Sequence, residues 1–158
     1  MNSRDLDIVL DVFTAMQKSA LLLQQFYKKC GIYYGEHGEF FAILSADVDG
    51  FIRAVEEMRM IIFDHPEMFS ITQCLGKAAQ AVGKLASELQ YKETEIKRKN
   101  ISSTDVLAFA RTMETLVLEA GYPDLLNSRH DDYSRLVEEV PRLSRLRRER
   151  IAEHLAAS

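Results

Sequence analysis

The sequence has few of the glycines and prolines that form turns, and few of the cysteines that form disulfides in small secreted proteins. Its 158 residues include only 7 glycines, 3 prolines and 2 cysteines, and they include no tryptophan. So few glycines and prolines argue against an all-β fold, which needs many turns. Cys30 and Cys74 form no CxxC pair and no cysteine–histidine cluster. We therefore expect two buried, reduced thiols and neither a zinc site nor a redox motif.

Long apolar runs are also missing. No stretch approaches the roughly 20 residues that span a bilayer. The opening residues, MNSRDLDIVLDVF, carry three aspartates and lack the apolar region of a signal peptide. The sequence thus predicts a cytoplasmic protein that does not contact a membrane.

The overall charge is weakly acidic. The formal net charge is −4, with 28% charged and 47% hydrophobic residues. This composition is sufficient for a folded core and excludes a polycation built to hold nucleic acid over its whole surface. The length fits one domain, which we expect to cover residues 1–158.

Apolar residues recur at alternating spacings of three and four, which is the pattern of helices that pack along heptad seams. The first seam is Leu6, Val9, Phe13, Met16, Ala20, Leu23, Tyr27 and Cys30, and its helix should end near Gly31. A second segment, from about Phe41, should stop before Pro66, because the residue before a proline is disfavoured in a helix. We expect a third helix over about 70–98.

Two further helices follow. The stretch SSTD at 102–105 predicts a capped helix start, and Gly121-Tyr122-Pro123 predicts its end. The last helix should begin near Asp131, and Pro141 inside it should kink or break it. Its expected apolar stripe is Tyr133, Leu136, Val137, Val140, Leu143, Leu146, Ile151 and Leu155.

The third segment also carries a stripe of small residues, namely Gly76, Ala79, Gly83 and Ala86. Each glycine inside a helix costs about 1 kcal/mol relative to alanine. A close approach by another helix would account for the stripe. Together the segments predict an all-α, antiparallel up-and-down bundle, with no strands.

Motifs for catalysis are missing. In a helical bundle, a di-metal centre needs Glu-x-x-His pairs, because residues three apart share a helix face. None of His37, His65, His130 and His154 has a carboxylate, cysteine or histidine at that spacing. Phosphate-binding glycine loops and the G-x-S-x-G nucleophile motif are absent too. We expect no catalytic residues and no cofactor.

Parts of the sequence resemble the ferritin-like superfamily, above all its rubrerythrin-like branch. Phe26-Tyr27, Phe40-Phe41 and Leu44 match the frame of that family's first helix pair, and DVLAFARTMETLVLEAGY resembles its third bundle helix. The resemblance implies a ferritin-like arrangement, with Glu114 at the position of a metal-bridging glutamate.

The other ligand positions that the resemblance implies are occupied by different residues. Ala20 stands where the first carboxylate would fall, and Val48 and Phe51 occupy the Glu-x-x-His frame. The fourth helix offers no such frame. The resemblance therefore implies a bundle whose metal centre has been replaced by packed side chains.

Glu114 has two interpretations. It lies beside Met113 and Leu116. It is either a buried carboxylate, paired with Arg111 one turn earlier or left from a metal site, or an exposed side chain that pairs with the same arginine. We favour the exposed pair.

Two segments are candidate contact sites. The first is the loop with Tyr33, Tyr34, Glu36 and His37, which joins the first two helices and offers aromatic rings beside flexible glycines. The second is the basic stretch with Arg142, Arg145, Arg147 and Arg148. Arginines in such a row either contact an acidic partner or form a solvated face whose stems cover apolar surface.

The function that we predict is non-catalytic, through contacts with another protein or a second copy of this chain. The first alternative is a metal-dependent oxidoreductase or storage protein. It would hold iron or another divalent metal between helices, with Asp47, Asp49 or Glu56 beside Glu114. The second alternative is a regulator that contacts nucleic acid through residues 142–150.

Overall fold

The chain folds into a bundle of long helices. The computed structural model describes residues 1–98 and 101–158. Within them the helices are α1 (Ser3–Tyr33), α2 (Gly38–Asp64), α3 (Leu75–Lys97), α4 (Ser103–Glu119) and α5 (Asp131–Ala156). The connections contain β1 (Phe69–Ile71) and β2 (Leu126–Ser128), with the single-turn helices η1 (Gly35–His37), η2 (Pro66–Met68) and η3 (Tyr122–Asp124). None of the described helices combines the length and the apolar character needed to cross a membrane.

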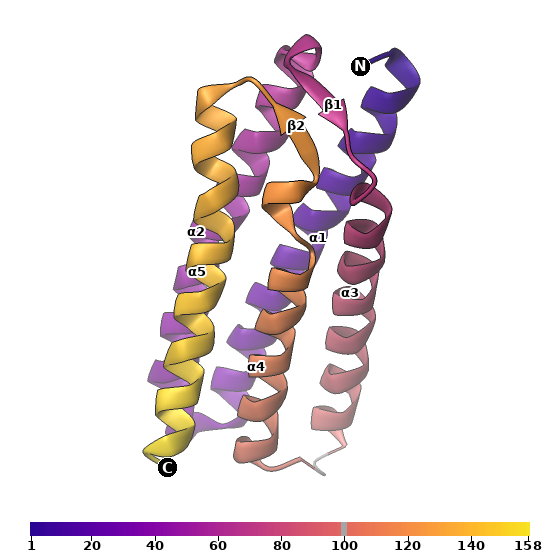
Figure 1. Ribbon diagram of the computed structural model, residues 1–158. Coiled ribbons are helices and arrows are strands. Elements are labelled where there is room, and N and C mark those ends of the chain that lie inside the picture. The colour runs from indigo at the N-terminus through magenta and orange to yellow at the C-terminus, as the bar shows by residue number, and fades with distance from the viewer. Residues whose placement is uncertain (99–100) are drawn as a thin grey trace.

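Helices that follow one another along the chain run in opposite directions (Figure 1). The main contacts are α1 with α2, α2 with α5, α5 with α4, α4 with α3, and α3 with α1, so the five helices close a ring. In this ring α1 and α3 run in the same direction, and the other neighbours are antiparallel. The prediction of an all-α antiparallel bundle is confirmed.

The helix boundaries follow local capping. The Asn2 side chain accepts a hydrogen bond from the Asp5 amide (2.8 Å) at the start of α1, and Ser102 does the same for Asp105 (3.1 Å) at the start of α4. Such caps satisfy amides that have no partner in the first turn of a helix. Gly121, with φ of 65°, ends α4 in the left-handed conformation that glycine favours. The predicted start and end of this helix are confirmed.

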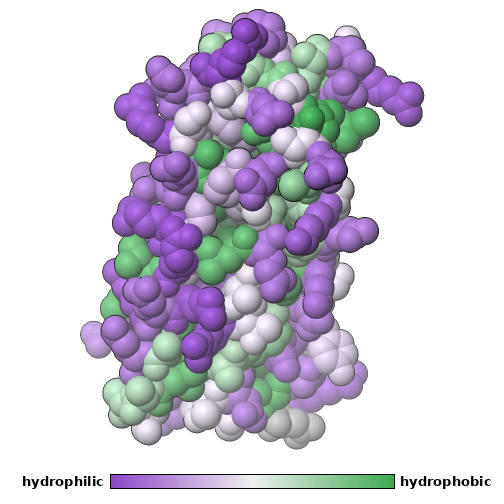
Figure 2. Space-filling model, viewed as in Figure 1, coloured by the Kyte–Doolittle hydropathy of each residue, from purple (hydrophilic) through white to green (hydrophobic). Residues whose placement is uncertain are grey.

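In α1 the core lies along the predicted seam, except that Leu6 is half-buried. In α1 the side chains of Val9, Phe13, Met16, Ala20, Leu23, Tyr27 and Cys30 are fully buried. Burying one large apolar side chain stabilises a fold by about 1.5–3 kcal/mol, so one such seam is a major stabilising element. On the outside, Figure 2 shows mainly hydrophilic residues, with hydrophobic ones in separate patches between them.

The structure adds two strands that the sequence analysis did not predict. β1 and β2 pair antiparallel, with Phe69 opposite Ser128 and Ile71 opposite Leu126. They join the α2–α3 and α4–α5 connections at one end of the bundle (Figure 1). The third helix consequently begins at Leu75 and not near residue 70. Three-residue strands are too short to produce a readable alternation.

Pro141 lies inside α5, which continues on both sides of it. A break at Pro141 is therefore wrong, and the kink that the sequence also allows stays a prediction. A proline inside a helix costs about 3 kcal/mol, since it removes a hydrogen bond and crowds the preceding turn. Here α5 packs against both α2 and α4, and that packing outweighs the local cost.

The small-residue stripe of α3 is not a close helix contact. Gly76, Ala79 and Gly83 are exposed, and a Cβ atom added to either glycine would meet no atom within 4 Å. The prediction of a close approach at this face is wrong for the isolated chain.

Candidate functional site

The most unusual feature of the core is an ion pair at its centre. Glu114 of α4 and Arg147 of α5 both have 0% exposed side chains. The Arg147 Nε atom donates to both carboxylate oxygens of Glu114, at 3.0 and 2.9 Å. The seams of α4 and α5 face inward, and these two residues occupy seam positions in them.

Two hydroxyl groups complete this cluster. The Tyr27 hydroxyl of α1 donates to Glu114 Oε2 at 2.6 Å. The Ser144 hydroxyl, one turn before Arg147, donates to Glu114 Oε1 and to the Glu114 backbone oxygen, both at 3.0 Å. Every contact is a donor that points at the carboxylate, so the cluster is built to hold a negative charge among helices α1, α4 and α5.

The electrostatics of the cluster favour a neutral tyrosine and a charged arginine. Burial raises the pKa of Tyr27 well above its ordinary value, and the charge of Glu114 raises it further. Burial by itself would lower the pKa of Arg147, but the Glu114 carboxylate and its hydrogen bonds raise that pKa above the usual value. Both groups keep these states at neutral pH.

The two terminal nitrogens of Arg147 have no hydrogen-bond partner among the described residues. The guanidinium carbon lies 5.5 Å from the ring centre of Phe51. A cation over an aromatic face is worth about 2 kcal/mol when both are desolvated. Phe51 of α2 therefore offsets part of the cost of these buried donors.

This geometry corrects the interpretation of Glu114. The favoured exposed pair with Arg111 is wrong, because Glu114 is buried and its partner is Arg147. The buried alternative is right, with a different arginine. Ala20, Val48 and Phe51, which fall at the other ligand positions of the ferritin-like resemblance, are fully buried core residues.

The carboxylates of the metal-dependent alternative are not assembled around Glu114. Asp47 pairs with Arg150, and Asp49 accepts a hydrogen bond from Gln24. Glu56 is exposed on α2. Within residues 1–98 and 101–158, no three His, Cys, Asp or Glu side chains form a group that could hold a metal ion.

The predicted arginine row divides into three environments. Arg147 is buried and does not belong to a contact surface, which corrects that prediction. Arg142 pairs with Glu139 on the same helix. Arg145 and Arg148 remain at the surface, where they line a groove of about 260 Å³ together with Arg111, Glu149 and Ala152. We call this the arginine groove; it lies between α4 and α5.

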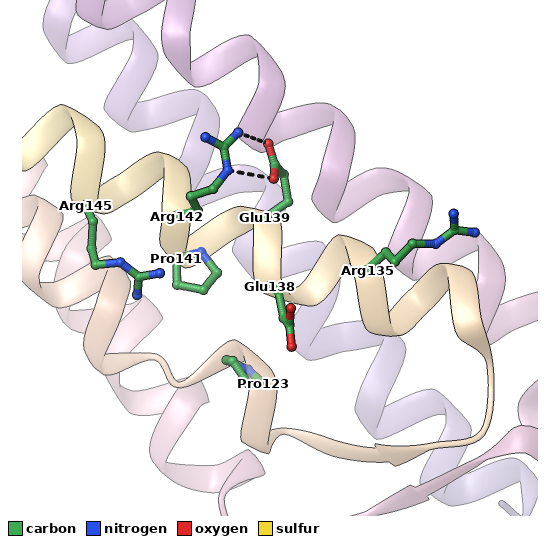
Figure 3. Close-up of a pocket in the computed structure, with 7 residues that line it drawn as sticks. All are labelled: Pro123, Arg135, Glu138, Glu139, Pro141, Arg142 and Arg145. Carbon is green, nitrogen blue, oxygen red and sulfur yellow. Dashed lines mark hydrogen bonds and ion pairs between the residues drawn. The ribbon is translucent and has the colours of Figure 1, made fainter.

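A second hollow of about 420 Å³ also has Arg145 in its lining (Figure 3). Its charges are mixed, and Figure 3 shows Arg142 pairing with Glu139 while Glu138 points toward Pro123. The Arg142 Nε donates to Glu139 Oε2 at 2.9 Å. The neutralised pair makes this hollow a weaker anion site than the arginine groove.

The loop between α1 and α2 folds onto the end of the bundle. Tyr33 and Glu36 are exposed, whereas the Tyr34 hydroxyl donates to the Ile101 backbone oxygen at 2.9 Å. His37 Nδ1 lies 2.8 Å from Nε2 of His154 near the end of α5. The structure thus ties this loop to α5, but it does not join it to the arginine groove in one site.

His154 is a residue that the sequence analysis did not select. Its ring stacks on Phe40, with centres 3.9 Å apart, while it shares a hydrogen bond with His37. Burial lowers the pKa of His154, and the neighbouring His37 lowers it further. No local sequence pattern indicates this pair, because the two histidines are far apart in the chain.

Comparisons with models of protein families, with curated proteins and with solved structures find no match to this chain.

Proposed function

We propose that this bundle is a non-catalytic binding protein that contacts an acidic segment of a partner protein through the arginine groove. The partner would place carboxylates between α4 and α5. Arg111, Arg145 and Arg148 would bind them by charge-assisted hydrogen bonds. Arginine suits this task because its planar guanidinium can bind a carboxylate through two parallel hydrogen bonds.

One observation carries this proposal: three arginines from two helices line one groove, and none of them forms an ion pair within residues 1–98 and 101–158. The ion pairs of the described arginines involve Arg135, Arg142, Arg147 and Arg150. Glu149 is the single acidic residue among those lining the groove. The groove therefore has a local excess of positive charge on a chain whose net charge is −4.

The buried cluster supports a structural role for the bundle centre. We propose a ferritin-like arrangement in which the guanidinium of Arg147 supplies the positive charge that a metal ion supplies in ferritin-like proteins. Both oxygens of the Glu114 carboxylate accept hydrogen bonds, from the Arg147 Nε atom and from the hydroxyl groups of Tyr27 and Ser144. Such a carboxylate has little capacity left to bind a metal ion.

The test is a binding measurement with a fluorescent peptide of about ten residues, rich in glutamate. Its affinity for the full chain would be compared with that for a variant carrying Arg111→Glu, Arg145→Glu and Arg148→Glu. We expect at least about a tenfold loss, which is about 1.4 kcal/mol. Binding should also weaken with added salt, because the groove is exposed.

The matched control is Arg142→Glu, which changes an exposed arginine already paired with Glu139. It should change the affinity by less than about twofold, because it lies outside the arginine groove. Equal affinities of the triple variant and the unchanged chain would refute the proposal. Tighter binding of single-stranded DNA than of the peptide, with a steep dependence on salt, would favour nucleic acid in its place.

A further inference from the structure

A different groove, on the opposite side of α5, combines exposed apolar side chains with acidic ones. It lies between α2 and α5 and has a volume of about 540 Å³. Its lining consists of Glu57, Met60, Ile61, Asp64, Asp132, Arg135 and Leu136. We call it the acidic groove. The arginine groove lies between α5 and α4, so the two are separate surfaces.

The apolar part of the acidic groove is more exposed than core residues of this bundle. Met60 is 54% exposed. Ile61 and Leu136 are half-buried. Two helices that leave a methionine exposed beside half-buried isoleucine and leucine side chains offer a surface on which a third helix can lie.

The charge of the groove selects the partner. Glu57 and Asp64 lie on α2, one on each side of Met60, and Asp132 lies on α5. Arg135 is the single basic residue in the lining, and it pairs with Asp132. The two carboxylates of α2 have no ion-pair partner among the described residues, which leaves the rim negative.

We infer that the acidic groove binds a basic amphipathic helix of a partner protein. The apolar face of that helix would cover Met60, Ile61 and Leu136, and its lysines or arginines would pair with Glu57 and Asp64. Charge complementarity of this kind increases the association rate and excludes acidic helices, while the apolar contacts supply the affinity. The inference does not depend on the proposed function of the arginine groove.

The probe is a synthetic helix of about 18 residues, with leucines on one face and lysines on the other. Its binding to the full chain would be followed by fluorescence anisotropy, beside a matched peptide with glutamate in place of lysine. We expect the basic peptide to bind in the acidic groove. Met60→Glu should weaken this binding at least about tenfold, because it places a charge on the apolar contact surface. The acidic peptide should bind only at the arginine groove, so Met60→Glu should leave its affinity unchanged.

Two control variants separate the groove from general attraction to an acidic protein. Ile43→Glu changes a side chain that is 51% exposed on the same helix, outside the groove, and should leave binding within about twofold. Glu57→Lys with Asp64→Lys should weaken binding and reduce its salt dependence, whereas Glu39→Lys, also exposed on α2, should not. Circular dichroism would confirm that each variant is folded.

Two results would overturn the inference. One is a basic peptide that binds all variants equally or does not bind at all. The other is a dimer of the unchanged chain in sedimentation that Met60→Glu converts to monomers, because the groove would then be occupied by a second copy. A monomer that binds the basic peptide only with an intact groove supports the inference.

Discussion

At the scale of single residues, the Glu114–Arg147 pair is the most constrained feature of the molecule. A buried ion pair adds little net stability compared with apolar residues of the same volume, since both charges lose their water. Losing only one partner is costly, because the other charge stays buried without compensation. In this protein Glu114 also accepts hydrogen bonds from the hydroxyl groups of Tyr27 and Ser144. Removing one charge therefore disturbs contacts among three helices.

Replacing Arg147 by methionine should destabilise the protein by about 3–5 kcal/mol, because the Glu114 carboxylate would remain buried without its partner. Urea unfolding would measure this loss. The control is Arg150→Met, which removes a partly exposed pair with Asp47 and should cost less than about 1 kcal/mol. The double change Arg147→Met with Glu114→Leu should recover most of the stability. Equal effects of the two single changes would contradict this account.

The His37–His154 pair predicts a loss of stability in acid. The pKa of His154 is lowered in the folded protein, so the unfolded chain binds its proton more readily. Stability is fully present above the ordinary histidine pKa of about 6.5 and is lost as the pH falls through the lowered value. Thermal unfolding between about pH 7.5 and pH 5 would show this loss.

The variant His154→Gln should reduce that acid-dependent loss, since it removes the group that titrates. His65→Gln is the matched control, because His65 is exposed at the other end of α2, and it should keep the original pH dependence. A His154 variant that loses as much stability in acid as the unchanged chain would rule out this pair as the source.

At the scale of elements, the buried face of α5 differs in part from the apolar stripe that the sequence predicts. Its buried positions are Tyr133, Val137, Val140, Ser144, Arg147 and Ile151, which alternate spacings of four and three without a break. The predicted stripe included Leu143 and Leu146 in place of Ser144 and Arg147, yet Leu146 is 37% exposed and Leu143 is half-buried. Strict spacing would have placed Ser144 and Arg147 inside and would have indicated a buried partner such as Glu114.

The exposed glycines of α3 predict a gain in stability on substitution. Gly83→Ala should stabilise the protein by about 0.5–1 kcal/mol, because the helix gains propensity and the added Cβ atom meets no neighbour. Urea unfolding would measure the gain. Gly121→Ala is the opposite control, since its φ of 65° disfavours a side chain, and it should destabilise the protein by about 1–2 kcal/mol. A loss of stability in the Gly83 variant would reveal a contact on this face.

At the scale of the whole molecule, the closed ring of helices protects its interior from reagents. Cys30 is fully buried on α1, and burial, with a smaller contribution from Glu93, raises the pKa of its thiol to about 12. The thiolate is the reactive form, so this residue should be inert while the bundle is closed. Cys74 lies in the connection before α3 and is only half-buried.

In a Cys74→Ser variant, alkylation of Cys30 should therefore report global opening of the bundle. Near pH 8 we expect it to react at least about a thousandfold more slowly than in the urea-unfolded chain, which corresponds to a typical stability of several kcal/mol. Mass spectrometry would follow the modification. Rapid labelling of Cys30 in the folded protein would show that α1 opens locally, which this packing does not predict.

Local patterns determined the helices of this protein. Heptad spacing located all five, and SSTD and Gly121 set the limits of the fourth, because caps and periodicity depend on neighbouring residues. The tertiary structure alone decided which polar residues meet. The contacts of Tyr27 with Glu114, of Glu114 with Arg147, and of His37 with His154 join segments that are distant in the chain. The same holds for the β1–β2 pairing and for the two grooves beside α5, since each exists only where two helices or connections come together.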